Sequence, residues 1–263
     1  TTTLKMILNL VSPDHGKVYF EGKETTNDNL LLLKNTGVLL EGSRNMFWSL
    51  SPHENFIYWG EQRGLSKAKA ERSGLLLMKK FGLLDKKDTT ITSLSRGMQQ
   101  IVGICCAMIA QPKLLILDEP TLGLDLKSAQ IVTNILQELS ANGVGILITT
   151  HQLDFAQKVA QKILLINHGK LVFSDNVKES LARLNKQTLL ELTLTRSLTL
   201  EEQEEISTYC NLTKKQMNCY QLEVKSQKAL PQVFNLLGKL PVRQIQTKER
   251  NLEDVFEYYT EEG

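Results

Sequence analysis

Short apolar runs alternate with helical periodicities along the first two thirds of the chain. Runs rich in Leu, Ile and Val predict buried strands at 37–40, 114–117 and 144–149. Apolar positions three and four residues apart predict helices in the segments around these strands. These helices are expected at 1–11, at 52–84 with a break at Gly64 and a new start at Ser66, at 95–110, at 127–140 and at 152–160. Strands that alternate with helices predict a parallel α/β sheet.

The pattern changes towards the C-terminus. Residues 163–166 and 171–173 predict a hairpin, and shorter periods begin at about residue 184. The later strands are expected at 189–195, 219–224 and 242–247, and the later helices at 200–209, at 229–237 and after Asn251. We therefore expect an α/β domain at 1–183, with an α-rich subdomain at about 50–94, and a small α+β extension at 184–263.

Composition narrows the class of protein. The 263 residues are 41% hydrophobic and 23% charged, as in folded domains. The net charge of +2, from 31 basic and 29 acidic residues, predicts no binding to nucleic acid. No apolar run approaches the about 20 residues that cross a bilayer. Four cysteines without Cys-x-x-Cys spacing are expected to be reduced and to act as small hydrophobic residues.

An acidic pair follows the second strand. Asp118 and Glu119 lie where the run 114–117 ends, and Pro120 and Gly123 turn the chain. Open parallel sheets bind ligands at this edge, where two carboxylates can hold Mg²⁺ and polarise a water molecule. An ordinary core strand that ends in solvated acids would have the same local pattern, so the pair alone leaves both interpretations open.

Three segments together resemble ABC transporter ATPases. They are Ser-Leu-Ser-Arg-Gly-Met-Gln-Gln at 93–100, the run 114–125, and Thr-Thr-His at 149–151. They match the signature, Walker B with D-loop, and switch histidine of that family, in the family's order. The resemblance covers residues 1 to about 180, and 252–256 is similar to the C-terminal extension of antibiotic and lantibiotic exporter ATPases. It implies a P-loop NTPase (RecA-like) parallel sheet with a helical subdomain, so that 1–183 would be the nucleotide-binding domain.

The resemblance also implies ATP and Mg²⁺ as cofactors. Thr1 would supply a hydroxyl ligand to Mg²⁺, with Thr2 beside it, and Asp118 would be the metal's carboxylate partner. Glu119 would orient and deprotonate the attacking water. His151 would reach the γ-phosphate.

A second set of residues would act across a dimer. Ser95 and Gly97 open a helix whose N-terminus favours anions, although Ser95 is also an ordinary helix cap. In the family this helix start contacts ATP bound to the other subunit. Arg96 replaces a glycine of that motif and Met98 replaces a glutamine. Asp125 would lie at the dimer seam.

Glu41 is a further departure from the family pattern. It follows the strand 37–40, where the family usually has a glutamine that senses Mg²⁺ and water, and a carboxylate can serve as a metal ligand. Aromatic residues follow it, at Phe47, Trp48, Phe56, Tyr58 and Trp59. They are expected to be core residues, some of which would line the family's groove for a membrane subunit.

The implied protein is the ATPase subunit of an exporter, peripheral on the cytoplasmic face of the cell membrane. It would pair with a second nucleotide-binding subunit, as a homodimer, and with a separate integral membrane permease. The alternatives are a soluble ABC ATPase that acts on ribosomes or DNA, and a non-catalytic regulatory remnant. The remnant is considered because the family's glycine-rich loop, which would precede Thr1, is absent. We interpret 1–263 as a truncated sequence and expect it, alone, to be unstable and not to bind ATP usefully.

Overall fold

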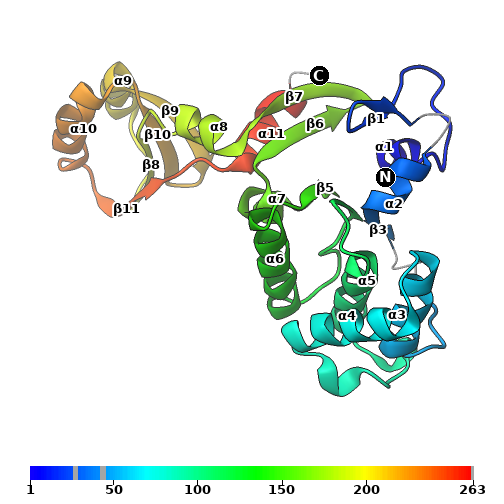
Figure 1. Cartoon of the computed structure of the whole chain (residues 1–263). Coiled ribbons are helices and arrows are strands. Elements are labelled where there is room, and N and C mark those ends of the chain that lie inside the picture. Colours follow the sequence, from blue (N-terminus) through cyan, green and yellow to red (C-terminus); the bar gives the residue numbers. More distant parts are fainter. Residues whose placement is uncertain (26–28, 42–45, 262–263) are drawn as a thin grey trace. The chain divides into compact units, whose positions relative to one another are not determined.

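The computed structural model describes residues 1–25, 29–41 and 46–261. It divides into two compact units, Thr1–Val159 and Ala160–Gly263 (Figure 1). The predicted domain boundary between residues 183 and 184 stays a prediction.

The first unit is built on a parallel sheet. Its strands are β3 (Thr36–Leu39), β4 (Leu114–Asp118) and β5 (Gly145–Thr149), in the order β3-β4-β5. All three lie within one residue of the predicted segments, and their parallel pairing confirms the predicted α/β sheet.

Strand β4 is buried on both faces. On one face Ile116 packs with Leu4 and Leu8, which belong to helix α1 (Thr2–Ile7) and its C-cap. On the other, Leu115 and Leu117 join the core that includes α5 (Arg96–Met108) and α6 (Leu126–Ala141). Successive side chains of a strand point to opposite faces, so a continuous apolar run suits a strand covered by helices on both sides.

Strand β5 is less buried than its sequence predicts. The run was expected to be a buried strand, but Ile146, Leu147 and Ile148 are only half-buried, whereas the adjacent β4 residues are fully buried. Within the described residues β5 pairs with β4 alone, so its second edge carries no strand. A hydrophobic run shows that a strand prefers to be buried. It does not show whether a neighbouring element covers the strand.

Two helices form the α-rich block. Helix α3 (Pro52–Gln62) starts at a capping box between Ser51 and Glu54, and α4 (Lys67–Lys80) starts at the predicted cap Ser66. Gly64, at φ +81°, interrupts the helical conformation between them. The predicted break and restart are confirmed.

The remaining elements of this unit are short. They include a short hairpin near residue 19 and a helix at residue 30 that was not predicted. These elements are β1 (Tyr19–Phe20), β2 (Lys23–Glu24), α2 (Leu30–Asn35), the 3₁₀ turns η2 (Leu84–Lys86) and η3 (Ile91–Ser93), and α7 (Leu153–Val159).

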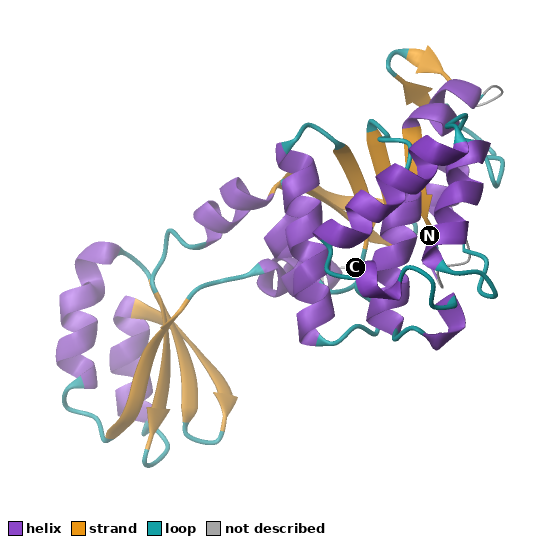
Figure 2. Cartoon of the chain, turned by 60° about the horizontal axis from the view of Figure 1, so that its bottom comes forward, coloured by secondary structure: helices purple, strands orange, loops and turns teal. Residues whose placement is uncertain are grey.

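The second unit opens with the predicted hairpin and continues as a separate antiparallel sheet. The elements in chain order are β6 (Lys162–Asn167), β7 (Lys170–Asn176), α8 (Val177–Leu184), β8 (Leu189–Leu194), α9 (Leu200–Tyr209), β9 (Cys210–Gln216), β10 (Cys219–Val224), η4 (Gln227–Ala229), α10 (Leu230–Leu237), β11 (Val242–Lys248) and α11 (Leu252–Glu261). The four-stranded sheet has the order β11-β8-β10-β9, and α9 and α10 cover one of its faces (Figure 2). This is the split βαββαβ arrangement. Strand β9 was not predicted because its residues are mostly polar and exposed.

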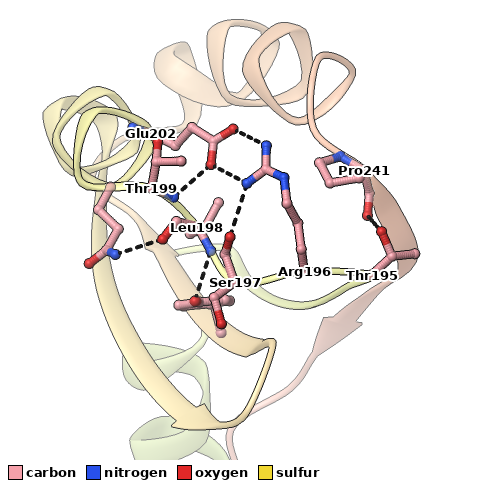
Figure 3. Close-up of polar contacts among 9 residues, drawn as sticks. Thr195, Arg196, Ser197, Leu198, Thr199, Glu202 and Pro241 are labelled. Atoms are coloured by element: carbon pink, nitrogen blue, oxygen red, sulfur yellow. Dashed lines mark hydrogen bonds and ion pairs between the residues drawn. The ribbon is translucent and has the colours of Figure 1, made fainter.

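A polar network fixes the start of α9 (Figure 3). Thr199 caps the helix, and its backbone amide donates to Glu202 Oε2 at 2.8 Å. Arg196 donates to both carboxylate oxygens of Glu202, at 2.8 and 2.6 Å. The buried hydroxyl of Tyr220 accepts from the amide of Leu198 at 3.1 Å. The network ties the loop after β8 to the sheet beneath it.

Two further sequence expectations concern the whole chain. All four cysteines are free; Cys105 and Cys106 are buried in the first core, where burial raises the pKa of both thiols. They act as small hydrophobic residues, as predicted. Among the described residues, no helix is both long and apolar enough to span a bilayer.

Candidate functional site

The candidate site lies at the carboxyl end of β4, where Asp118 is 1% exposed. Its Oδ1 accepts hydrogen bonds from the Thr149 hydroxyl and, at 3.0 Å, from the Thr1 hydroxyl. Parallel register brings Thr149 of β5 opposite Asp118. Thr1 precedes α1, which packs on the same sheet. The structure thus brings the predicted pair Thr1 and Asp118 together.

The acidic pair has two buried oxygens that are open to a cation or to a water molecule. Asp118 Oδ2 and Glu119 Oε2 are buried and have no hydrogen-bond partner among the described residues. A buried oxygen without a partner is costly, and carboxylate oxygens are the ligands that Mg²⁺ prefers. The described residues contain no cluster of three or more His, Cys, Asp or Glu side chains that could hold a metal by themselves. Mg²⁺ commonly takes one or two carboxylates and completes its shell with water and phosphate oxygens, and the free oxygen of Asp118 fits that use.

Glu119 has an unusual backbone conformation. Its φ of +50° is left-handed, and its amide donates to the Thr149 carbonyl at 3.0 Å. The left-handed region is strained for non-glycine residues and is often found at functional sites. Glu119 Oε1 lies 2.9 Å from Nδ1 of His151, whose side chain is 65% exposed while that of Glu119 is 16% exposed. The structure therefore joins the predicted catalytic residues Glu119 and His151.

The start of α5 packs against the start of α6. Ser95 caps α5 and accepts from the Met98 amide at 3.3 Å. Gly97 is buried, and a Cβ there would lie 2.7 Å from Ser128 Cβ and still closer to its hydroxyl. Arg96 is exposed, whereas Met98 is half-buried against the apolar core. Glycine at 97 thus serves close packing, and Met98 serves the core.

Asp125 caps α6. Its Oδ1 accepts from the Ser128 amide at 2.7 Å, and this hydrogen bond lowers the pKa of the carboxyl. The residue is therefore ionised at neutral pH. Helix capping explains Asp125 within one chain; its expected place at a dimer seam stays a prediction.

Two predicted site residues are not joined to this group. Thr2 is the exposed first residue of α1, and Glu41 is exposed two residues beyond β3. Among the described residues, no hydrogen bond or ion pair connects either one to Asp118 or Glu119. Residues 42–45, which follow Glu41, lie outside the described part of the chain.

Sequence reasoning missed the hydroxyl groups around the acidic pair. Besides Thr149, Thr121 donates from Oγ1 to Gln152 Oε1 at 2.7 Å and so links the turn after Glu119 to the segment after His151. The available signal was position: both threonines lie at or just after the carboxyl ends of neighbouring parallel strands.

The aromatic residues near α3 divide into core and surface. Phe56 is fully buried, while Phe47 and Trp48 are 42% and 41% exposed. Tyr58 meets Phe47 and Trp59 edge-on, with ring centroids 4.5 and 5.2 Å apart. Phe56 is therefore core, as expected, and Phe47 and Trp48 remain available at the surface.

Comparison with known proteins places the chain in a family. A family model described as ABC transporter matches residues 1–122. NatA, an ABC transporter ATP-binding protein of Bacillus subtilis, is 30% identical over 173 residues, which cover 66% of this chain and 70% of NatA. The linearmycin resistance protein LnrL of Bacillus subtilis is 27% identical, with 74% of this chain and 62% of LnrL covered. The daunorubicin/doxorubicin resistance protein DrrA of Streptomyces peucetius is 31% identical, with 72% of this chain and 57% of DrrA covered.

Solved structures agree. The ATP-binding subunit of an ABC transporter matches with a TM-score of 0.61 and 27% identity, covering 69% of this chain and 75% of that one. A dimeric ATP-binding cassette in a post-hydrolysis state with ADP and Pi matches with a TM-score of 0.59 and 23% identity, covering 66% of this chain and 79% of that one. At this identity the match supports the fold and nothing finer. These matches confirm the P-loop NTPase fold class. By sequence and by fold, the chain belongs to the ATP-binding proteins of the ABC transporter family.

Proposed function

We propose that this protein binds and hydrolyses ATP to drive a separate membrane permease, and that it works as an exporter subunit. The observation that carries the proposal is the acidic pair: a buried carboxylate with a free oxygen beside a second carboxylate that pairs with a histidine. An ordinary strand that ended in solvated acids would leave neither oxygen buried.

The residues have separate roles in this proposal. Asp118 and Thr1 would hold Mg²⁺, and the Thr149 hydroxyl keeps Asp118 oriented. Mg²⁺ held there would supply positive charge against the phosphates. Glu119 accepts a proton from the attacking water at Oε2, while His151 holds Oε1 and presents its exposed ring to the γ-phosphate.

The proposal includes two partners. Ser95, Arg96 and Gly97 present the start of α5 to ATP held by a second copy, with Asp125 at the seam, as in a family that includes a dimeric cassette with ADP and Pi. Thr2 and Glu41 would join the site when nucleotide and metal bind. A permease would hold the protein at the cytoplasmic face of the membrane, with Phe47 and Trp48 exposed for contact. Relatives named for linearmycin and daunorubicin resistance favour export of antibiotics.

Replacing Glu119 by glutamine tests this function. In the full-length protein with MgATP, Glu119→Gln is expected to keep ATP binding and to lose most of the hydrolysis, since removing a general base typically costs about 10²–10⁴-fold. Phosphate release measures turnover, and equilibrium nucleotide binding measures affinity. Glu138→Gln, on the exposed side of α6, is the matched control. Hydrolysis by Glu119→Gln at the parental rate would remove Glu119 from this role.

A further inference from the structure

Arg96 makes a contact that its place in the family motif does not explain. Its guanidinium lies over Gly123, in the turn that follows the acidic pair: a Cβ built on Gly123 would come within 2.7 Å of Cζ and Nη1 and 3.1 Å of Nε of Arg96. Gly123 has φ +69°, which favours glycine over other residues. The absent side chain thus leaves room for the planar group of Arg96.

The turn itself is tied to Glu119 by its backbone. The Leu122 amide donates to the Glu119 carbonyl at 3.2 Å, and the Leu124 amide donates to the Thr121 carbonyl at 3.2 Å. The Thr121 side chain is in turn held by Gln152. Gly123 has no side chain with which to pack, so Arg96 provides the covering contact at this point of the turn.

The contact is one of packing. Among the described residues, Arg96 forms no ion pair and no side-chain hydrogen bond, and its side chain is exposed. A planar guanidinium can lie flat on a peptide backbone, which a lysine ammonium cannot do. The neighbouring Gly97 is locked against Ser128, so the backbone that carries Arg96 is fixed on α6. Arg96 therefore covers the turn from a rigid base.

We propose that Arg96 is a positioning residue: by packing on Gly123 it holds the turn 121–125, and through the hydrogen bond from Leu122 it holds the backbone of Glu119 in its left-handed conformation. This inference rests on the proposed ATP hydrolysis for its catalytic consequence. Its structural part, the ordering of the turn, is independent of any activity.

Hydrogen exchange tests the structural part in the nucleotide-free full-length protein. In Arg96→Ala the amides of Leu122 and Leu124 are expected to exchange about fivefold faster, equivalent to about 1 kcal/mol at 1.4 kcal/mol per factor of ten. Arg72→Ala is the matched control, because Arg72 is also an exposed arginine on a helix of the same unit. It should leave these amides unchanged. Equal exchange in Arg96→Ala and the parent overturns the proposal.

Kinetics test the consequence. Arg96→Ala is expected to lower kcat measured at saturating ATP, where an effect of Arg96 on binding of the second copy's ATP does not limit the rate and the effect of the turn on Glu119 remains. Arg96→Lys should resemble Arg96→Ala if the planar group is needed; parental behaviour in Arg96→Lys would indicate a role for charge and overturn the packing mechanism. Faster exchange with an unchanged kcat overturns the positioning role. Faster exchange in a protein whose parent hydrolyses no ATP would refute the proposed function and leave the contact with the turn established.

Discussion

Asp118 and Glu119 are adjacent in the sequence but have different surroundings. Asp118 continues β4 and is held by two hydroxyls, whereas Glu119 leaves the strand at φ +50° and meets His151. These different partners suit the proposed division of roles, in which Asp118 would hold the metal and Glu119 would accept a proton.

Gly97 offers a stability test at the same scale. Gly97→Ala is expected to destabilise the protein by about 1–3 kcal/mol, the usual cost of overpacking, because the new Cβ meets Ser128. Urea denaturation measures the change. Ser128→Gly in the same chain should restore part of the loss by removing the obstructing side chain.

Gly145→Ala is the control for this pair, since a Cβ at Gly145 would meet its nearest atoms at 3.5 Å, an ordinary contact. If Gly97→Ala and Gly145→Ala have the same stability, the two helix starts are not closely packed at Gly97.

At the scale of elements, the start of α9 predicts a pH dependence. The Arg196 side chain, followed by the Thr199 amide, lowers the pKa of Glu202 from 4.5 to about 2. A carboxyl whose pKa is lower in the folded state stabilises that state above its unfolded pKa and loses this effect as pH falls. The contribution of Glu202 is therefore complete above pH 4.5 and is lost as pH approaches about 2.

Thermal melts of Glu202→Gln and the parent test this dependence. The difference in melting temperature of the second unit should be constant from neutral pH to pH 4.5 and should shrink below it. Glu205→Gln, at an exposed position of the same helix, should show no such dependence. A difference that stays constant down to pH 2.5 would show that the Arg196 pair does not lower the pKa of Glu202.

The sheet of the second unit shows which elements a local sequence pattern predicts. The helix α9 and the strand β10 have the bounds that their apolar spacing predicts. Strand β9 has no such spacing, yet it pairs with β10 from Cys210 to Gln216. An edge strand can carry few apolar side chains. Pairing of its backbone with the neighbouring strand therefore determines its structure.

For the molecule as a whole, two separate cores predict two unfolding transitions. One core centres on Leu115 and its neighbours in Thr1–Val159, and the other includes Leu222 in Ala160–Gly263; both leucines are fully buried. Leu115→Ala should lower only the first unit's transition and Leu222→Ala only the second's, each by about 2–5 kcal/mol. Differential scanning calorimetry separates the transitions. If both variants shift one common transition, the units unfold cooperatively.

The sequence by itself determined the order of most elements, the α-rich block between strands, the acidic pair at a strand end and the family. These are local properties. The spacing of apolar residues indicates which face of an element prefers burial, and Gly, Pro and Ser mark where the element begins or ends. Only the tertiary structure decided which side chains meet. It placed Thr149 on Asp118, His151 on Glu119 and Arg96 over Gly123, and it left β5 half-buried. Such contacts join residues far apart in the chain, and they depend on strand register and helix packing, which no local pattern encodes.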